Sequence, residues 1–211
     1  MNKKEEFLKM MNFRHACKLF DTTKKISDED MHYILEVARK SPSSFGMEAW
    51  KFLVITNDEL KEELKPFCWN QPQITTCSHL VIVLAGIEAL KVESGTVRSR
   101  FMRRNLPQEQ LDAYMKLYAS HLSDTLSSDE KIYQWSARQT YIAAANMMSA
   151  AAFIGIDSCP IEGFEKENVE KVLGLDRSVY QVAMLLPFGY RINEQSTQVR
   201  LSFESVVEFI K

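Results

Sequence analysis

The first clear pattern along the chain is a stretch in which hydrophobic residues recur at helical spacing. Four apolar residues fall on one helical face: Met31, Ile34, Leu35 and Ala38. Ser27, followed three positions later by Asp30, resembles a capping box, which marks the start of a helix. Ser41 precedes Pro42, and a residue before proline disfavours helical geometry. The pattern therefore predicts a helix that begins after Ser27 and ends at Lys40.

Short apolar runs alternate with further helical stretches. Three runs are typical of buried strands, namely 51–56, 78–85 and 180–188. Asn57 caps a helix that extends to Lys65, and more helices are predicted over 107–124, 129–156 and 165–173, the last closed by Gly174. Long helices beside a few short strands favour an α+β domain over a regular βαβ alternation. We expect one domain that spans residues 1–211.

Two apolar segments, 139–156 and 206–210, need a partner surface that covers them. Residues 139–156 carry no charge over 18 positions, which touches the lower length limit of a membrane-spanning helix. The segment contains polar residues and many alanines, so we expect a helix that is buried on all sides by protein. Residues 206–210 could form a strand without an obvious partner nearby, which favours pairing with another subunit.

Composition narrows the kind of partner. The chain has 211 residues, of which 45% are hydrophobic and 26% are charged, enough to bury a core. The net charge of -2 is scattered without long blocks of one sign, so we expect a small-molecule partner and neither nucleic acid nor a membrane. Four dispersed cysteines and an N-terminus unlike a secretory leader favour a cytoplasmic location.

Several motifs of nucleotide and metal chemistry are absent from the sequence. It contains neither the G-x-G-x-x-G fingerprint, nor the G-x-x-x-x-G-K-[ST] phosphate loop, nor a G-x-S-x-G nucleophile elbow. The four histidines are dispersed, so no metal site is expected, and His79 lies in an apolar run that favours a core position. Any bound nucleotide must therefore be held by side chains.

Three weak signals remain. Arg14-His15-Ala16-Cys17-Lys18 brings two cations within reach of an anion, although a solvated basic turn has the same composition. The segment 41–44, Ser-Pro-Ser-Ser, offers hydroxyls and free amides after a helix end, as an ordinary loop also would. The segment 157–164 turns through Pro160 and Gly163 beside a core helix, and an unremarkable helix exit would do the same.

Taken together and in this order, the motifs resemble one family. They are Arg14-His-Ala-Cys-Lys-Leu-Phe-Asp21, Ser41-Pro-Ser-Ser followed by Trp50 and Phe52, Trp69-Asn70 before Ser78-His79, and Pro160-Ile-Glu-Gly-Phe164. The pattern is similar to that of the oxygen-insensitive NAD(P)H nitroreductases and NAD(P)H:flavin oxidoreductases, which depend on FMN. The resemblance runs from about Asn12 to Phe209, and the joint match is specific where each motif alone is not.

The resemblance implies a nitroreductase-like α+β fold. Such a fold has a central, mostly antiparallel sheet flanked by long helices, in an interlocked homodimer whose C-terminal strands are exchanged. One FMN would lie at each edge of the interface. The apolar segment 137–156 and the apolar tail at 206–210 fit this arrangement.

The resemblance also assigns site residues. Arg14, His15 and Lys18 would contact the phosphate, ribityl chain and pyrimidine edge of FMN, and Arg200 would add a phosphate contact. Asn70 would bind the ring edge or the substrate, while Ser43 and Ser44 would reach the flavin of the other subunit. The Glu162–Gly163 backbone would lie beside flavin N(5). The complete expected cofactor-binding set is Arg14, His15, Ala16, Lys18, Ser43, Ser44, Asn70, Pro160, Ile161, Glu162, Gly163 and Arg200.

The function implied is transfer of hydride from NADH or NADPH, through FMN, to a nitroaromatic, quinone or flavin-like acceptor. Because one open pocket would serve both substrates in turn, ping-pong kinetics are expected. No catalytic side chain is needed, since FMN carries the hydride. Alternatives are a relative specialised for reductive dehalogenation or dehydrogenation, a non-catalytic protein that stores or senses FMN, and an interaction module without a cofactor.

The sequence departs from the family pattern at several positions. Ala16 stands where serine is frequent, Gln73 and Gln198 stand where relatives tend to carry lysine, and the segment 46–49 replaces an asparagine and a Q-P pair. These departures concern FMN affinity and the choice of substrate. Residues 87–125 resemble the family least. Candidate channel residues there, which core packing explains equally well, are Phe101, Met102, Tyr114, Tyr118 and His121.

Overall fold

The computed structural model describes residues 2–211 and contains a four-stranded sheet in the order β1-β2-β4-β3. All neighbouring strands are antiparallel. The strands are β1 (Trp50–Ile55), β2 (His79–Gly86), β3 (Asp157–Ser158) and β4 (Tyr180–Gly189). Long helices surround this sheet, so the predicted α+β class and the three predicted strands are confirmed.

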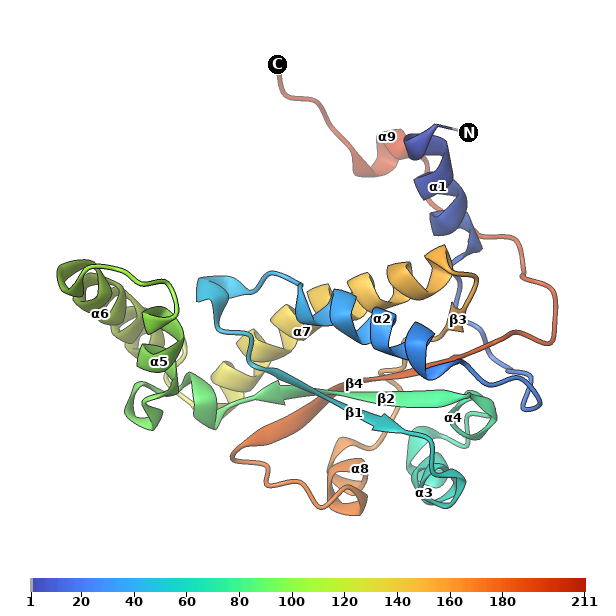
Figure 1. Cartoon of the computed structure of the whole chain (residues 1–211), viewed down its shortest axis with the longest axis horizontal. Coiled ribbons are helices and arrows are strands. Elements are labelled where there is room, and N and C mark those ends of the chain that lie inside the picture. The colour runs from blue at the N-terminus through green and yellow to red at the C-terminus, as the bar shows by residue number, and fades with distance from the viewer. Residues whose placement is uncertain (1) are drawn as a thin grey trace.

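Helices cover both faces of the sheet (Figure 1). One face carries α2 (Asp28–Arg39) and the long α7 (Asp129–Phe153). The other carries α3 (Asp58–Leu64), α4 (Gln73–Thr76) and α8 (Lys166–Val172). At one end lie α5 (Thr96–Met102) and α6 (Gln108–Thr125). Short 3-10 turns are η1 (Ser44–Gly46), η2 (Lys65–Cys68), η3 (Glu88–Leu90) and η4 (Val92–Ser94).

β2 is the centre of the fold because every residue in it is buried. Successive side chains of a strand point to opposite faces. Leu80, Ile82 and Leu84 therefore enter the core on the α3 and α8 side. Val81 and Val83 enter the core formed with α2 and α7. Two cores on one continuous apolar strand explain why 78–85 reads as an apolar run without alternation.

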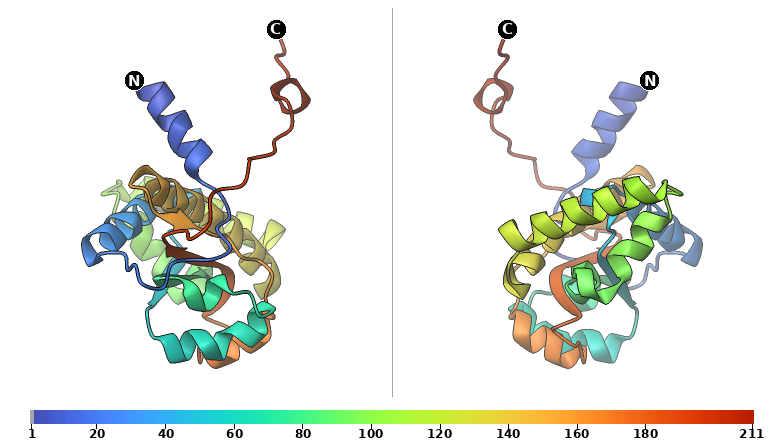
Figure 2. Two further views of the ribbon diagram at one scale, coloured as in Figure 1. Left: turned by 90° about the vertical axis from the view of Figure 1, so that its right-hand side faces the viewer. Right: turned by 90° about the vertical axis from the view of Figure 1, so that its left-hand side faces the viewer.

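The two ends of the chain form arms that rise from the same side of the body (Figure 2). One arm is α1 (Lys3–Phe13), and the other contains the short helix α9 (Phe203–Val206). Pairing of the segment 206–210 with another subunit stays a prediction. Within residues 2–211 the segment forms no strand with its own chain, since Val206 ends α9 and no strand pairs with the last five residues. The reason is that the tail leaves the sheet: Phe209 is 74% exposed and Ile210 is 93% exposed.

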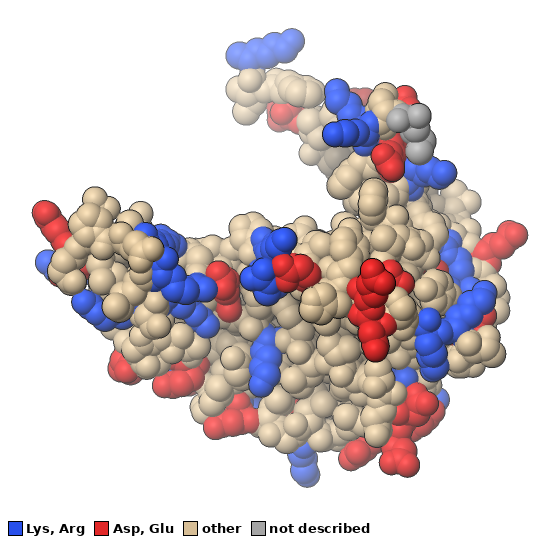
Figure 3. Space-filling model, viewed as in Figure 1, with Lys and Arg blue, Asp and Glu red and all other residues tan. Residues whose placement is uncertain are grey.

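α7 also differs from its prediction. We expected a helix buried on all sides, but Tyr141, Ile142 and Phe153 are 38%, 40% and 56% exposed. The body covers only the opposite face of the helix, where Ala143, Met147 and others pack against the sheet. Across residues 2–211, no helix has the length and apolarity that a membrane span requires. Acidic and basic side chains are mixed over the face drawn in Figure 3.

Candidate functional site

Two of the three motif segments lie side by side at the β3 edge of the sheet. Ala16 forms a parallel bridge with Ser158, and the amide of Cys17 donates to the Ser158 carbonyl at 3.0 Å. Lys18 then reaches Cys159, with 3.6 Å between Nζ and Sγ. The Arg14–Lys18 segment is thus extended and not helical. Its two cations, Arg14 and Lys18, are therefore presented as they would be along a strand.

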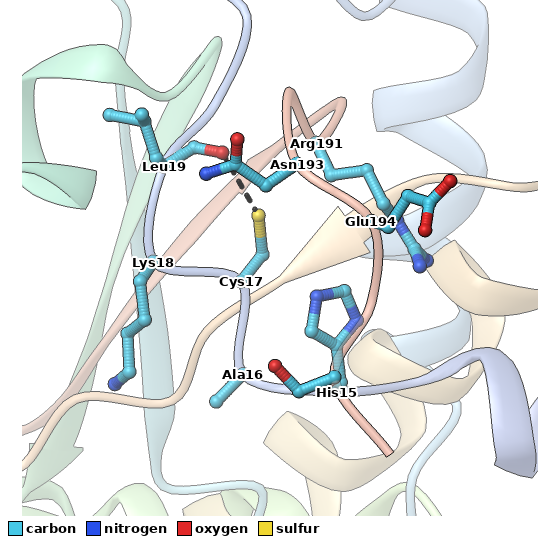
Figure 4. A pocket seen from close by; sticks show the side chains of 9 residues that line it. His15, Ala16, Cys17, Lys18, Leu19, Arg191, Asn193 and Glu194 are labelled. Atoms are coloured by element: carbon cyan, nitrogen blue, oxygen red, sulfur yellow. Dashed lines mark hydrogen bonds between the residues drawn. The ribbon is translucent and has the colours of Figure 1, made fainter. Parts of the chain in front are cut away.

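Extension sends alternate side chains of this segment to opposite sides. Lys18 points toward Cys159, whereas the Cys17 thiol donates to the Leu19 carbonyl on the other side (Figure 4). That other side holds a cavity of about 150 Å³. Its lining residues are His15, Ala16, Cys17, Lys18, Leu19, Arg191, Asn193, Glu194 and Ser196.

A buried carboxylate organises the charges beside this cavity. Asp157 lies 2.6 Å from the Arg191 guanidinium and 3.6 Å from Nδ1 of His15. Burial, followed by the charge of Arg191, lowers the pKa of His15. Burial raises the pKa of Cys17 to about 11 and also raises the pKa of Cys159. The thiols are therefore protonated near neutral pH, and His15 is biased toward its neutral form.

A third segment, residues 69–73, joins the other two through hydrogen bonds of glutamine side chains. Gln73 contacts the Cys159 sulfur at 3.9 Å, and Gln71 donates to the Gly163 carbonyl at 2.8 Å. Trp69 and Asn70 have φ values of 55° and 53°, a left-handed geometry that asparagine tolerates and that tryptophan adopts at a cost. The Trp69 indole lies so close to Gly163 that an added Cβ would sit 2.5 Å from it. Asn70 itself is exposed.

The segment after β4 fastens the end of α1. The Gln198 amide donates to the carbonyls of Met11, Asn12 and Arg14 at 3.2, 3.0 and 2.6 Å. Gln195 adds a bond of 2.7 Å to the Asn12 carbonyl. These carbonyls belong to the last turn and the C-cap of α1, where intrahelical partners run out. Gln198 therefore has a structural partner set that the sequence did not reveal.

The Ser43 and Ser44 region lies apart from this convergence, and within residues 2–211 no hydrogen bond or ion pair joins the Arg200 side chain to it. Arg200 is exposed, and its guanidinium donates to the carbonyl of Val199. The Ser44 amide donates to Gln139 on α7 at 2.9 Å. From Gln139 to Phe153 the helix advances about 21 Å, so Ser43 and Ser44 lie far from the β3 edge in the same chain.

The candidate channel residues form part of a packed cluster. Phe101 and Tyr118 are fully buried, and the Tyr118 hydroxyl donates to the Leu90 carbonyl at 2.7 Å. Tyr114 stacks at a tilt on Phe101, with centroids 5.6 Å apart, while Met102 is 57% exposed. Core packing therefore accounts for Phe101 and Tyr118. The predicted core position of His79 is confirmed, since it is 8% exposed.

Sequence reasoning missed Gln71 and Arg191. Both act through partners that are distant in the chain, Gly163 and Asp157, and no local motif marks them. A polar residue beside the Trp69-Asn70 motif was the available signal for Gln71. Among residues 2–211, no three side chains of the metal-ligating types gather into a possible metal site.

Known proteins match this chain along most of its length. The profile of the nitroreductase family matches residues 11–190. A Bacillus subtilis relative named "Putative NAD(P)H nitroreductase YfkO" is 37% identical over 217 residues, which cover 98% of both chains. A Staphylococcus haemolyticus protein, also named a putative NAD(P)H nitroreductase, is 39% identical over 218 residues, again with 98% of both chains covered.

Solved structures agree with the sequence matches. A protein from Exiguobacterium sibiricum, described as a putative nitroreductase in complex with FMN, is 27% identical with a TM-score of 0.82, and 97% of each chain is covered. A Bacillus subtilis structure described as a putative nitroreductase is 22% identical with a TM-score of 0.86, covering 98% of this chain and all of that one. The latter likeness shows the fold alone. With the predicted fold confirmed and the profile matched, the chain belongs to the nitroreductase family.

Proposed function

We propose that this chain is an FMN-dependent oxidoreductase that takes hydride from NADH or NADPH and reduces small planar acceptors. The family membership, the names of the relatives and the FMN complex of a structural neighbour support the cofactor and the co-substrate. Nitroaromatic, quinone and flavin-like compounds are the acceptors that we propose. The whole chain, residues 1–211, would form one FMN-binding domain.

The observation that carries the proposal is the meeting of three distant segments at Cys159. Lys18 and Gln73 both place nitrogen atoms at the Cys159 sulfur, 3.6 and 3.9 Å away. Within residues 2–211, no hydrogen bond uses the amide N–H of Glu162 or Gly163. A cation and free backbone donors around one edge fit a ring rich in acceptor atoms, as the FMN ring is.

The phosphate would be held by side chains. Arg14 and Lys18 lie on the same side of the extended segment, because they are separated by an even number of residues. We propose that they bind FMN with Ala16, Asn70 and the backbone of His15 and of 160–163, and that Arg200 reaches the phosphate from the tail. FMN supplies a two-electron carrier that accepts hydride and passes it on. The protein binds the ring, orients it and presents donors to it.

We further propose a homodimer with exchanged tails. The exposed apolar face of α7 and the exposed residues Phe203, Phe209 and Ile210 of the tail would be covered by a second copy. In that assembly Ser43 and Ser44 would face the cofactor of the partner, which agrees with their distance from the β3 edge in one chain. The free and buried cysteines, together with the need for reduced nicotinamide, support a cytoplasmic location.

Kinetics and spectra test this function. We expect flavin absorption bands after reconstitution with FMN, and parallel double-reciprocal plots for NAD(P)H and a nitroaromatic or quinone, since each substrate needs the same position over the ring.

Arg14→Gln should lower FMN affinity by about 1.5–3 kcal/mol, the range of a charged hydrogen bond. Arg98→Gln, at an exposed ion pair with Asp112, is the matched control and should have no effect.

Other outcomes identify the alternatives. FMN binding without NAD(P)H oxidation would indicate storage or sensing of FMN. NAD(P)H oxidation coupled only to a halogenated acceptor, or reduction of FMN by hydride taken from a substrate without NAD(P)H, would indicate a relative specialised for dehalogenation or dehydrogenation. A protein that stays colourless with added FMN would exclude the proposed function and favour an interaction module. Intersecting double-reciprocal plots would exclude the single-position, ping-pong scheme.

A further inference from the structure

Two glutamine side chains form a hydrogen-bonded chain that ends on the backbone of Gly163. The Gln73 amide donates to Oε1 of Gln71 at 2.9 Å. The Gln71 amide donates in turn to the Gly163 carbonyl at 2.8 Å and to the Cys68 carbonyl at 3.0 Å. This hydrogen-bonded relay therefore connects the start of α4 to the loop at Gly163, which lies 92 residues after Gln71.

The orientation of both amides is fixed by their partners. The nitrogen of Gln71 faces two carbonyl oxygens, so a rotation of its amide would set oxygen against oxygen. Its Oε1 must then point to Gln73, whose side chain is 2% exposed and needs a protein partner for its donor. The two hydrogen bonds from Gln73 to Gln71 and from Gln71 to Gly163 therefore form this relay in one arrangement of the amides only. In that arrangement the Gly163 carbonyl is held toward the Gln71 amide.

Gly163 is the residue of this loop whose backbone most needs such a restraint. Glycine has the largest conformational freedom, and a side chain is excluded here by the Trp69 indole. The peptide before Gly163 is held because the Phe164 amide donates to the Glu162 carbonyl at 3.0 Å. The peptide after it is held by Gln71. The Ile161 carbonyl, which shares its peptide with the Glu162 N–H, accepts from the Leu185 amide at 3.1 Å. With these three carbonyls occupied on the protein side, the N–H groups of Glu162 and Gly163 are left for a ligand.

We propose that Gln71 and Gln73 are positioning residues, which hold the Gly163 backbone so that its N–H and that of Glu162 donate to the ring of bound FMN. The proposal rests on the proposed function, since it assigns these amides to FMN. It gives the buried Gln73 side chain a role in orienting a donor instead of supplying charge. Neither glutamine needs to touch the cofactor.

The test compares the FMN-loaded wild type with Gln71→Glu, Gln71→Met and Gln73→Met. Gln71→Glu keeps the shape of the side chain but has no donor, and Gln71→Met removes the polar atoms. Gln110→Glu, on the exposed face of α6, adds the same charge and is the matched control. Two quantities are measured: the two-electron midpoint potential of bound FMN, and hydrogen exchange of the amides in 161–165.

Both Gln71 variants should change the ratio of the affinities for reduced and oxidised FMN about tenfold, equivalent to about 30 mV for a two-electron couple. They should also speed exchange in 161–165. Gln73→Met should have the same effects at smaller amplitude, because Gln71 keeps its own donors. The control should match the wild type. A Gln71 variant that is folded but releases FMN, beside a control that retains it, also supports the proposal.

Potentials and exchange rates unchanged in folded, FMN-loaded Gln71 variants would overturn the relay and leave the proposed function intact. Wild-type protein that binds no FMN would overturn both. If neither Gln71 variant folds, Gln73→Met decides between the outcomes by the same two measurements. A shift in the Gln110→Glu control equal to that of Gln71→Glu would assign the effect to charge and exclude positioning.

Discussion

Asp157 and Arg191 form an ion pair that joins β3 to the segment after β4. The guanidinium Nη2 lies 2.6 Å from Oδ1, and Nε donates to Oδ2 at 3.0 Å. Arg191 also lies over the Phe13 ring at 4.2 Å and donates to the Phe13 carbonyl. The end of α1, the β3 edge and the last segment of the chain therefore meet at one side chain.

The first prediction concerns this pair. Asp157→Asn should lower the free energy of unfolding by about 2–3 kcal/mol, below the range for a fully buried pair because Arg191 keeps a fifth of its surface exposed. Urea denaturation measures the change. Arg103→Gln, at an exposed pair with Glu48, should cost less than about 1 kcal/mol. Equal losses of unfolding free energy in the two variants would mean that the Asp157–Arg191 pair stabilises the protein no more than an exposed ion pair does.

The second prediction concerns pH. Burial is the main cause that lowers the pKa of His79 from its usual 6.5, with Asp28 opposing and Lys61 and Lys25 assisting. The unfolded chain thus takes up a proton near pH 6.5, while the folded chain takes it up only at lower pH. The free energy of unfolding should therefore keep its highest value above pH 6.5 and decrease as the pH falls below 6.5.

His79→Gln should remove part of this loss, as measured by urea unfolding at pH 7.5 and pH 5.5. His15, whose pKa is lowered in the same direction, accounts for the remainder. Carboxylates such as Asp58 have lowered pKa values and act only in a more acidic range, near pH 4 and below. An identical pH dependence in wild type and variant would contradict the prediction.

The third prediction concerns Gly163 and Trp69. A Cβ at Gly163 would lie 2.5 Å from Cζ3 of the indole, so Gly163→Ala must displace Trp69. We expect a loss of about 1 kcal/mol in unfolding free energy, the low end for overpacking because Trp69 is 68% exposed. Trp69→Ala should remove the collision, so the double variant should lose less than the sum of the two single ones. Strict additivity would show that the indole is not the obstacle.

The fourth prediction concerns Gln198. A lysine there can donate to the same three carbonyls and adds a cation at the C-terminal end of α1, where a positive charge stabilises a helix by about 0.3–1 kcal/mol. Gln198→Lys should therefore leave the free energy of unfolding unchanged or slightly higher. It should also tighten FMN binding, because it adds positive charge beside Arg14, which we propose binds the phosphate. Gln198→Glu removes the donor and should cost about 1–3 kcal/mol. Urea unfolding and FMN titration separate the two effects, and weaker FMN binding by the lysine variant would place the phosphate elsewhere.

The sequence predicts those elements whose signals are local. The helix after Ser27, the buried strand at 78–85 and the glycine-closed helix at 165–173 follow from periodicity, caps and turn residues within a few positions, and all three are present. The tail at 206–210 forms no strand within its own chain, because strand formation depends on a partner strand, which we propose a second copy supplies. The sequence did not show which face of α7 its own chain leaves exposed, because composition does not say which side of a helix the rest of the chain covers.

The candidate site shows the same limit. The Arg14–Lys18 and Pro160–Gly163 motifs are visible in the sequence, and their pairing is not, because it depends on a bridge between Ala16 and Ser158. Gln71 and Arg191 gain their roles only from residues that are distant in the chain. Local pattern finds the parts of the site, and long-range hydrogen bonds decide their arrangement.

The bonds from Gln198 and Gln195 to the end of α1 join residues that are synthesised far apart in time. Gln198 and Arg14 are separated by 184 positions, so the last turn of α1 leaves the ribosome long before the side chains that satisfy its carbonyls exist. Contacts of such high sequence separation carry a large loop-closure cost, which slows folding. A nascent chain that stops short of residue 191 would have the sheet and most helices but an open α1 end, which leaves the segment beginning at Arg14 without its support.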